Sequence, residues 1–261
     1  MPKVFHILDM AGQGSILSHF LNKYTLITSQ SYYVKKGSRI DMINNYYNST
    51  PFKNIKHLLY NIIKKKFNIA HIHSAEILVP LFKLLGKKVV LHYHGSDINM
   101  PSRKNSKLRR LCRDMADIIL YNDKDMTIPT RTKCVYFPDI IDTDLFKNNN
   151  QQKEGSLIMV SNNLNIQETI KNIPKTTIIQ NHSDNHVEYS KMPHYLSQFQ
   201  TYIDEKVNDK GQRLNAFSNT GLQAMACGLT VVKGGQTYYE LPKEHHPHTV
   251  IENLIEIYKN A

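Results

Sequence analysis

The chain has 261 residues, of which 41% are hydrophobic and 21% are charged. This composition argues against a largely disordered chain and allows one large or two small α/β domains. The cysteines Cys112, Cys134 and Cys227 show no C-x-x-C spacing, which argues against a disulfide framework or a zinc knuckle. The longest nearly apolar stretch, Ile77–Leu85, contains Lys83 and is too short to span a bilayer, so we expect a cytoplasmic protein.

The formal net charge of +11 is unevenly distributed along the chain. Residues 1–150 hold 23 Lys+Arg and 11 Asp+Glu, whereas residues 151–261 hold 10 and 11. This asymmetry indicates an anionic partner for the N-terminal half, which could be phospholipid, nucleic acid or a phosphorylated substrate.

Short β-rich runs alternate with helical patterns in the first half of the chain. We expect strands at 4–8, 24–28, 68–73, 87–94 and 117–121, and helices at 16–21, 53–67, 76–85 and 106–115. The 53–67 helix has the clearest pattern, because its apolar residues recur at the spacing of one helix face. Strands that alternate with helices predict parallel pairing and an α/β fold with a doubly wound sheet.

The second half predicts a separate and smaller α/β unit. A polar run, Asn148–Gln152, indicates a linker at 148–155 between an N-terminal domain at 1–147 and a C-terminal domain at 156–261. Within the C-terminal domain we expect strands at 156–161, 176–180, 201–203 and 229–232, and helices at 193–199, 220–226 and 248–259.

A glycine-containing loop, Met10–Ser15, lies between the first predicted strand and the first predicted helix. Gly12 and Gly14 would let a ligand approach the backbone, and the helix N-terminus behind them suits a diphosphate. The loop lacks the full G-x-G-x-x-G pattern, so a tight turn between strand and helix is the alternative interpretation.

Two pairs of histidines end neighbouring predicted strands. His92 and His94 point to the same face by strand alternation, and His71 and His73 repeat the arrangement one strand earlier. The carboxyl ends of parallel strands are where open α/β sheets bind ligands. A metal site is one interpretation, but Asp97 is the only close carboxylate and strand histidines are usually structural, so no metal is expected.

A third segment, 218–232, predicts a helix followed by a strand. Ser218 or Thr220 would cap the start of the helix and Gly228 would end it. By itself this pattern is typical of an ordinary helix–strand unit.

Taken together and in order, these segments resemble the retaining glycosyltransferases of family 4, which have the GT-B fold. The matching segments are the loop with Gly12 and Gly14, the turn His94–Asp97, the junction Pro138–Phe146 and the helix-to-strand segment Gln223–Val232. The resemblance implies two Rossmann-like domains that face each other across a cleft, the C-terminal one reduced in size. It also implies that the nucleotide is held mainly by the C-terminal domain.

The function implied by the resemblance is sugar transfer from a UDP- or GDP-sugar donor to a lipid-linked or glycan acceptor, without metal or cofactor. The resemblance makes His94 the catalytic residue. The expected donor-binding residues are Gly12, Gln13, Gly14, Asp97, Asn215, Ser218, Thr220, Gly221 and Gln223.

Two positions depart from the family pattern. The family has two glutamates eight residues apart, and the corresponding residues here are the amides Asn215 and Gln223. An amide can bond a hydroxyl but cannot stabilise a developing cation by charge. The alternative hypothesis is therefore a catalytically inactive GT-B protein that binds a nucleotide sugar or a partner enzyme.

Basic side chains gather on two predicted helices of the N-terminal half. The set that could face an anionic membrane or a lipid-linked acceptor is Lys53, Lys56, Lys64, Lys65, Lys66, Arg109 and Arg110. A solvated outer helix face is the alternative. We do not expect nucleic-acid binding, because no helix-turn-helix, zinc finger or aromatic RNA motif accompanies the charge.

Overall fold

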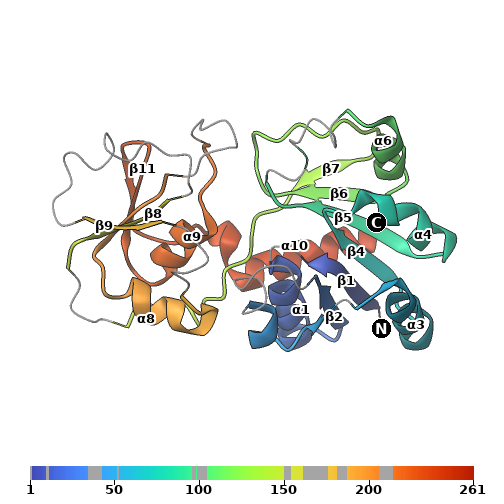
Figure 1. Cartoon of the computed structure of the whole chain (residues 1–261), viewed down its shortest axis with the longest axis horizontal. Coiled ribbons are helices and arrows are strands. Elements are labelled where there is room, and N and C mark those ends of the chain that lie inside the picture. Colours follow the sequence, from blue (N-terminus) through green and yellow to red (C-terminus); the bar gives the residue numbers. More distant parts are fainter. Residues whose placement is uncertain are drawn as a thin grey trace. The chain divides into compact units, whose positions relative to one another are not determined.

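The computed structural model describes residues 2–9, 12–34, 43–51, 53–95, 98, 105–149, 154–160, 176–180, 187–205 and 214–261. The chain divides into two compact units. The first unit contains Met1–Ile140 together with Pro247–Ala261, and the second contains Ile141–His246. Figure 1 shows each unit built around its own sheet.

The described part of the first unit contains a seven-stranded parallel sheet in the order β3-β2-β1-β4-β5-β6-β7. The strands are β1 (Lys3–Asp9), β2 (Thr28–Tyr33), β3 (Thr50–Pro51), β4 (Ile69–His73), β5 (Lys88–Tyr93), β6 (Ile118–Tyr121) and β7 (Cys134–Tyr136). The order reverses between β1 and β4. In open α/β sheets, ligands bind beyond the carboxyl ends of the strands at such a reversal.

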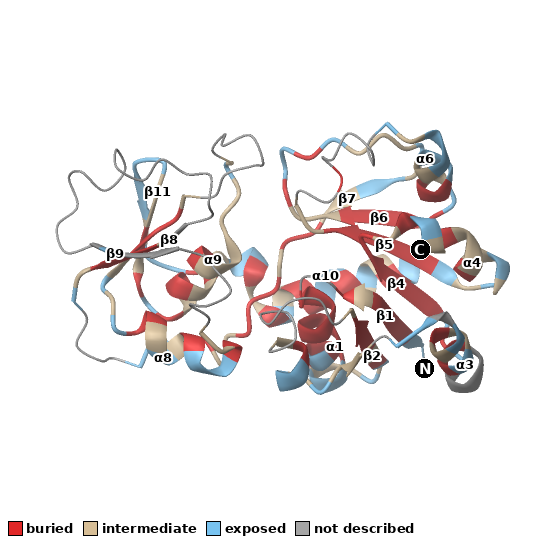
Figure 2. Ribbon diagram, in the orientation of Figure 1, coloured by how far each residue is buried: buried red, intermediate tan, exposed pale blue. Residues whose placement is uncertain are grey.

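Helices cover the sheet of the first unit. They are α1 (Gln13–Tyr24), α3 (Ile55–Lys65), α4 (Val79–Leu84), which follows the 3₁₀ turn η1 (Glu76–Leu78), α6 (Lys107–Asp114) and α10 (Pro247–Asn260). One face of the sheet is apolar: Phe5, Ile72 and Leu91 pack there with Leu58 of α3 and Phe82 of α4, all fully or almost fully buried. Figure 2 shows how much of β1, β4 and β5 is buried.

The helix α10 joins the first unit although it is the last element of the chain. It packs against α1, and the hydroxyl of Tyr258 lies 2.7 Å from Nδ1 of His71 in β4. The compact units therefore differ from the predicted boundaries 1–147, 148–155 and 156–261, which placed this helix in the second domain. The reason is tertiary packing, since the apolar face of α10, with Val250, Ile251 and Leu254, is buried in the first unit.

The described part of the second unit has a five-stranded sheet in the order β12-β11-β10-β8-β9. Its strands are β8 (Ser156–Val160), β9 (Thr176–Gln180), β10 (Thr201–Ile203), β11 (Thr230–Lys233) and β12 (Gln236–Tyr238). All pairs are parallel except β11 with β12, which are joined by Gly234 and Gly235, both at positive φ, as a tight hairpin requires. The helices are α8 (Met192–Leu196) and α9 (Asn219–Ala226), with 3₁₀ turns η3 (Tyr189–Lys191) and η4 (Lys243–His245).

The α/β prediction is confirmed, with a seven-stranded parallel Rossmann-like sheet and a smaller second sheet among the described residues. The strand predicted at 24–28 is wrong, because α1 continues through Tyr24 and the strand begins at Thr28. β2 has the polar sequence TSQSYY, and the side chain of Asn22 exchanges two hydrogen bonds with the backbone of Ser29. The helix is thus fastened to a strand that hydrophobic periodicity does not reveal.

Candidate functional site

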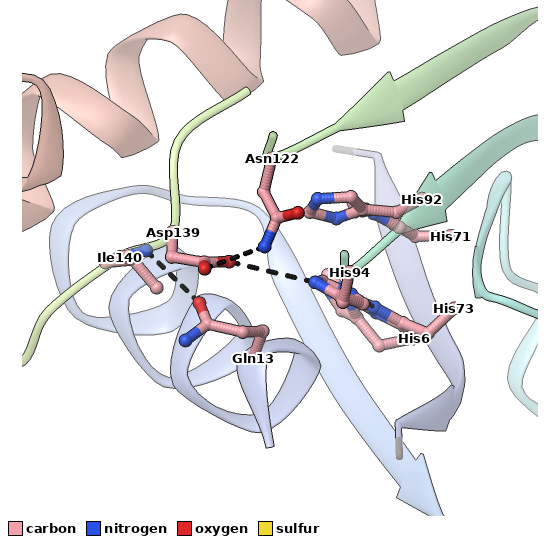
Figure 3. Close-up of polar contacts among 9 residues, drawn as sticks. All are labelled: His6, Gln13, His71, His73, His92, His94, Asn122, Asp139 and Ile140. Atoms are coloured by element: carbon pink, nitrogen blue, oxygen red, sulfur yellow. Dashed lines mark hydrogen bonds and ion pairs between the residues drawn. The ribbon is translucent and has the colours of Figure 1, made fainter. Parts of the chain in front are cut away.

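Five histidines gather on one face of the first sheet, where β1, β4 and β5 lie side by side. His6 is in register with His71, and His73 is in register with His92. Because residues in register on parallel strands point to the same face, these four side chains and His94, two residues after His92, form one group. We call it the histidine cluster. Figure 3 shows the five rings together with Asn122 and Asp139.

Two series of contacts connect the rings. In the first, Nδ1 of His6 lies 3.1 Å from Nε2 of His73, and Nδ1 of His73 lies 2.7 Å from Nε2 of His94. Nδ1 of His94 in turn lies 3.8 Å from the carboxylate of Asp139. In the second, the Tyr258 hydroxyl meets Nδ1 of His71, whose Nε2 lies 3.2 Å from Nδ1 of His92.

Burial holds four of the five histidines in the neutral form. Desolvation, reinforced by repulsion from His94, lowers the pKa of His6 to about 3. Burial also lowers the pKa values of His71, His73 and His92 well below the ordinary value, with the neighbouring histidines adding to the effect. Neutral imidazoles donate one hydrogen bond and accept one, and this is also the form that binds metals.

Asp9, at the carboxyl end of β1, fastens α1 to this site. Its Oδ2 accepts hydrogen bonds from the backbone N–H and the hydroxyl of Ser15, each at 2.7 Å. Asp9 is fully buried and its Oδ1 has no hydrogen-bond partner in the described structure. Desolvation raises the pKa of Asp9, although the hydrogen bonds from Ser15 oppose that rise.

The predicted glycine loop packs tightly against protein atoms. A Cβ on Gly14 would lie 2.6 Å from Nε2 of His73, and one on Gly12 would lie 2.7 Å from the side chain of Ile43. Gly12 also has a φ of +76°, which favours glycine. The side-chain oxygen of Gln13 accepts a hydrogen bond from the Ile140 backbone N–H at 3.1 Å (Figure 3). These contacts account for both glycines and for Gln13 structurally, and donor binding by them stays a prediction.

His94 lies half-buried at the edge of the cluster, beside Asp139 and Asn122. The amide of Asn122 donates a hydrogen bond of 2.7 Å to Oδ2 of Asp139, so the carboxylate lies between an amide and an imidazole. The catalytic role predicted for His94 is untested. Its partner in the sequence motif, Asp97, lies outside the described residues.

A second polar site lies within the second unit, at the carboxyl ends of β10 and β11. A pocket of about 230 Å³ is lined there by side chains that include Asp204, Glu205, Asn215, Lys233, Gln236 and Tyr238. Lys233 is nearly buried, with its ammonium 3.8 Å from Oδ2 of Asp204. Among the described residues, the lining of the pocket thus includes a cation, two carboxylates and neutral hydrogen-bonding groups.

The N-terminus of α9 faces Asp204 within this site. Oδ2 of Asp204 accepts a hydrogen bond from the Ser218 backbone N–H at 2.9 Å, and the Ser218 hydroxyl accepts one from the Gly221 N–H at 2.9 Å. A Cβ on Gly221 would lie 2.7 Å from Oδ2 of Asp204. Ser218 and Gly221 therefore use their N–H groups within the protein, where the sequence predicted donor-phosphate contacts. Of the predicted donor residues on this side, Asn215 lines the pocket.

Thr220 and Gln223 lie on α9 and are both half-buried. Neither is among the residues described as lining the pocket. Their predicted contacts with a donor are untested.

The predicted basic face divides into paired and exposed side chains. Lys53, Lys56 and Lys66 are exposed at the two ends of α3. The side chains of Lys64 and Lys65 lie outside the described residues. On α6, Arg110 is exposed, whereas Arg109 bonds the buried carboxylate of Glu76 at 2.9 Å.

Sequence reasoning found four of the histidines but did not include His6, Asp9, Asp139 or Lys233 in a site. His6 could have been found from its register with His71, had the pairing of β1 with β4 been known. Lys233 could have been found as the last residue of a strand in a parallel sheet.

No protein-family model matches the chain, and no curated protein sequence does. Its structure, however, resembles solved structures. A glycosyltransferase from Rickettsia africae ESF-5 has a TM-score of 0.51 and 12% identity, covering 99% of this chain and 88% of that one. The S. aureus MnaA–UDP co-structure has a TM-score of 0.50 and 9% identity, with the same two coverages.

The chain has a GT-B-like fold. At these identities the similarity concerns the fold alone, so the predicted membership of family 4 and the predicted chemistry stay hypotheses. No helix within the described residues is both long and apolar enough to cross a membrane.

Proposed function

We propose that the protein is a retaining glycosyltransferase, similar to family 4, that transfers a sugar from a nucleotide-diphosphate donor to a lipid-linked or glycan acceptor. The observation that carries the proposal is the pocket at the carboxyl ends of β10 and β11 in a GT-B-like fold. The solved structures with this fold include a glycosyltransferase and a protein in complex with UDP, which agrees with a nucleotide-sugar substrate.

The pocket offers chemistry suited to such a donor. The Lys233 ammonium would offset charge on the diphosphate, and Asn215 would bond a ribose or sugar hydroxyl. In the reaction, the bond between the anomeric carbon and the diphosphate oxygen breaks, and a bond to the acceptor oxygen forms on the same face of the sugar. The acceptor hydroxyl gives its proton to the departing diphosphate oxygen, and the nucleoside diphosphate leaves. Lys233 supplies the cation for this step, so donor binding is expected to need no divalent metal.

The decisive experiment is titration of the protein with UDP- and GDP-sugars in the presence of a chelator, by calorimetry and by thermal shift. One of these donors should bind and raise the melting temperature, because a ligand that binds only the native state stabilises it. Lys233→Ala should weaken binding about 10–100-fold, as expected for a charge-assisted contact. Lys243→Ala, an exposed lysine of the same unit, is the matched control and should bind normally. No shift with any nucleotide at millimolar concentration would reject the donor site.

A catalytically inactive GT-B protein that binds a nucleotide sugar is the second candidate. It is favoured by the amides Asn215 and Gln223, which stand where the resembled family has two glutamates and which cannot stabilise a developing cation by charge. The two candidate functions differ in whether the bound donor is converted to products. Release of nucleoside diphosphate from a bound donor supports the enzyme, and tight binding without turnover supports the inactive protein.

A lipid-linked acceptor is favoured by the outer face of α6. Leu108 and Leu111 are 67% and 60% exposed, and they lie beside Lys107 and the exposed Arg110. Exposed leucines among basic side chains suit an anionic bilayer, since apolar burial and charge attraction add. We therefore propose a cytoplasmic protein at the inner face of a membrane, held peripherally.

Vesicle sedimentation tests the membrane proposal. The protein should bind vesicles with anionic lipid and be released as salt rises, because screening shortens electrostatic attraction to about 8–10 Å. The double variant Leu108→Ser/Leu111→Ser should lose binding, whereas Leu26→Ser, at another exposed leucine of the first unit, should keep it. Equal binding to neutral and anionic vesicles would contradict the proposal.

A further inference from the structure

The histidine cluster occupies a place where a sheet normally carries apolar residues. The opposite face of the same strands is apolar, with Phe5, Ile7 and Ile72 in the core. Burying an imidazole is costly unless both ring nitrogens find partners. Yet Nε2 of His92, in a side chain that is 1% exposed, has no hydrogen-bond partner in the described structure. Among the described residues, this buried nitrogen therefore has no group to donate a hydrogen bond to or to accept one from.

His73, His92 and His94 form the part of the cluster nearest the carboxyl edge of the sheet. One ring nitrogen of each lies within 4.8 Å of one ring nitrogen of the others. His94 is the least buried of the three residues, although its side chain is only 6% exposed. Nδ1 of His73 and Nε2 of His94 are already 2.7 Å apart. Two nitrogens bound to the same tetrahedral zinc lie about 3.3 Å apart, given Zn–N bonds of about 2.0–2.1 Å.

From this geometry we propose that His73, His92 and His94 bind one divalent transition-metal ion of the zinc class, with a fourth position open toward the carboxyl edge of the sheet. The ligand atoms would be Nδ1 of His73, Nε2 of His92 and Nε2 of His94. Three imidazoles with an open position are typical of zinc sites that keep a water or a substrate group. This inference goes beyond the proposed function, whose donor pocket lies in the second unit.

The groups around the three ligands support this assignment. In each ring the nitrogen not assigned to the metal faces another side chain. Nε2 of His73 meets Nδ1 of His6, and Nδ1 of His92 meets Nε2 of His71, which is held in turn by the Tyr258 hydroxyl. Metal-binding histidines usually have such a partner on the second nitrogen, and it fixes the tautomer and the orientation of the ring.

His94 faces a partner of a kind that metal-binding histidines commonly have. Its Nδ1 faces the Asp139 carboxylate at 3.8 Å, and Asn122 holds that carboxylate from the other side. A carboxylate–histidine–metal arrangement of this kind raises the basicity of the ligand. Tightening of the Asp139–His94 contact on metal binding is a consequence of the proposal.

Competition titration of metal-free protein with Zn²⁺ against a coloured chelator tests the proposal without any activity assay. The wild type should bind one Zn²⁺ per chain, and Co²⁺ in its place should give the visible spectrum of a tetrahedral site. His73→Ala and His94→Ala should lose at least 100-fold in affinity. Asp139→Asn, which leaves the three ligands in place, should lose about 10–100-fold. His194→Ala, an exposed histidine of the second unit, should bind as the wild type does.

Circular dichroism of each variant identifies those that fail to fold, and for them the Asp139→Asn result decides. The absence of stoichiometric Zn²⁺ binding by the wild type would overturn the proposal. Binding equal in His73→Ala, His94→Ala and wild type would also overturn it. These outcomes are independent of donor binding, so failure of the metal site and failure of the proposed function can be told apart.

Discussion

The two units both collect polar groups at the carboxyl edge of a parallel sheet, but the groups differ in charge and in exposure. In the first unit they are imidazoles packed under α1 and α10, and burial keeps those of His71, His73 and His92 neutral. In the second unit they are carboxylates and an ammonium around a pocket. The difference indicates that the second edge suits a charged, soluble ligand, whereas the first suits an ion or a reacting group that must be held away from water.

The largest expected difference between the two units is their loss of stability in acid, which should be greater in the first unit. Unfolded histidines bind protons below about pH 6.5, whereas burial holds the pKa values of His6, His71, His73 and His92 lower in the folded unit. The unfolded state then binds more protons, so the free energy of unfolding decreases as the pH falls below 6.5. Each histidine contributes at most about 1.4 kcal/mol per pH unit. Asp9, whose pKa is raised, acts in the opposite direction, but it is a single group.

Hydrogen exchange of metal-free protein at pH 7.5 and 5.5, corrected for the intrinsic effect of pH, measures this loss. Protection in β1, β4 and β5 should fall by several kcal/mol, and protection in β8, β10 and β11 should change little. Equal loss in the two sheets would show that the histidines are not the cause.

A glycine in the first turn of α1, and another in the first turn of α9, each pack against a polar side chain of the neighbouring site. Gly14 leaves room for His73, and Gly221 leaves room for Asp204, with a Cβ at 2.6 and 2.7 Å from those side chains. Gly14→Ala and Gly221→Ala should each destabilise the protein by about 1–3 kcal/mol, as overpacking does. In donor titration Gly221→Ala should also lose affinity, because its collision moves Asp204, a side chain of the pocket. Loss of donor affinity in Gly14→Ala alone would mean that the donor binds at the edge of the first sheet and not at the edge of the second.

The sequence predicted the elements that local patterns mark, and it missed contacts set by tertiary structure. Short β-rich runs located β1, β4 and β5, and the capped segment 218–232 located α9. It could not show that β1 lies beside β4, so the convergence of His6 with His73 was not foreseen. Nor could it show that Asp204, fourteen residues before Ser218, would bond the N-terminus of α9. Both contacts depend on strand order, which no local pattern contains.

The smallest expected effect concerns Gln223, which stands where the resembled family has a glutamate. If it bonds a ribose hydroxyl, Gln223→Ala should cost about 0.5–1.5 kcal/mol of donor binding, the usual net value of one neutral hydrogen bond. Gln223→Glu should weaken donor binding or leave it unchanged, because it adds a negative charge on the helix whose start already faces the Asp204 carboxylate. Calorimetry on the three proteins, with melting temperatures as the folding control, measures this. Tighter binding by Gln223→Glu would contradict this prediction and would mean that a glutamate, as in the resembled family, suits this position better than the amide.

The division of roles between the two units is tested most directly by nuclear magnetic resonance. A titration of isotope-labelled protein with UDP, and separately with GDP, in the presence of a chelator reports on every backbone amide. The proposed function predicts that one nucleotide shifts the amides at the ends of β10 and β11 and in the first turn of α9, above all Asp204, Lys233 and Gly234. Saturating shifts confined to the first unit, or no shifts with either nucleotide, would contradict it.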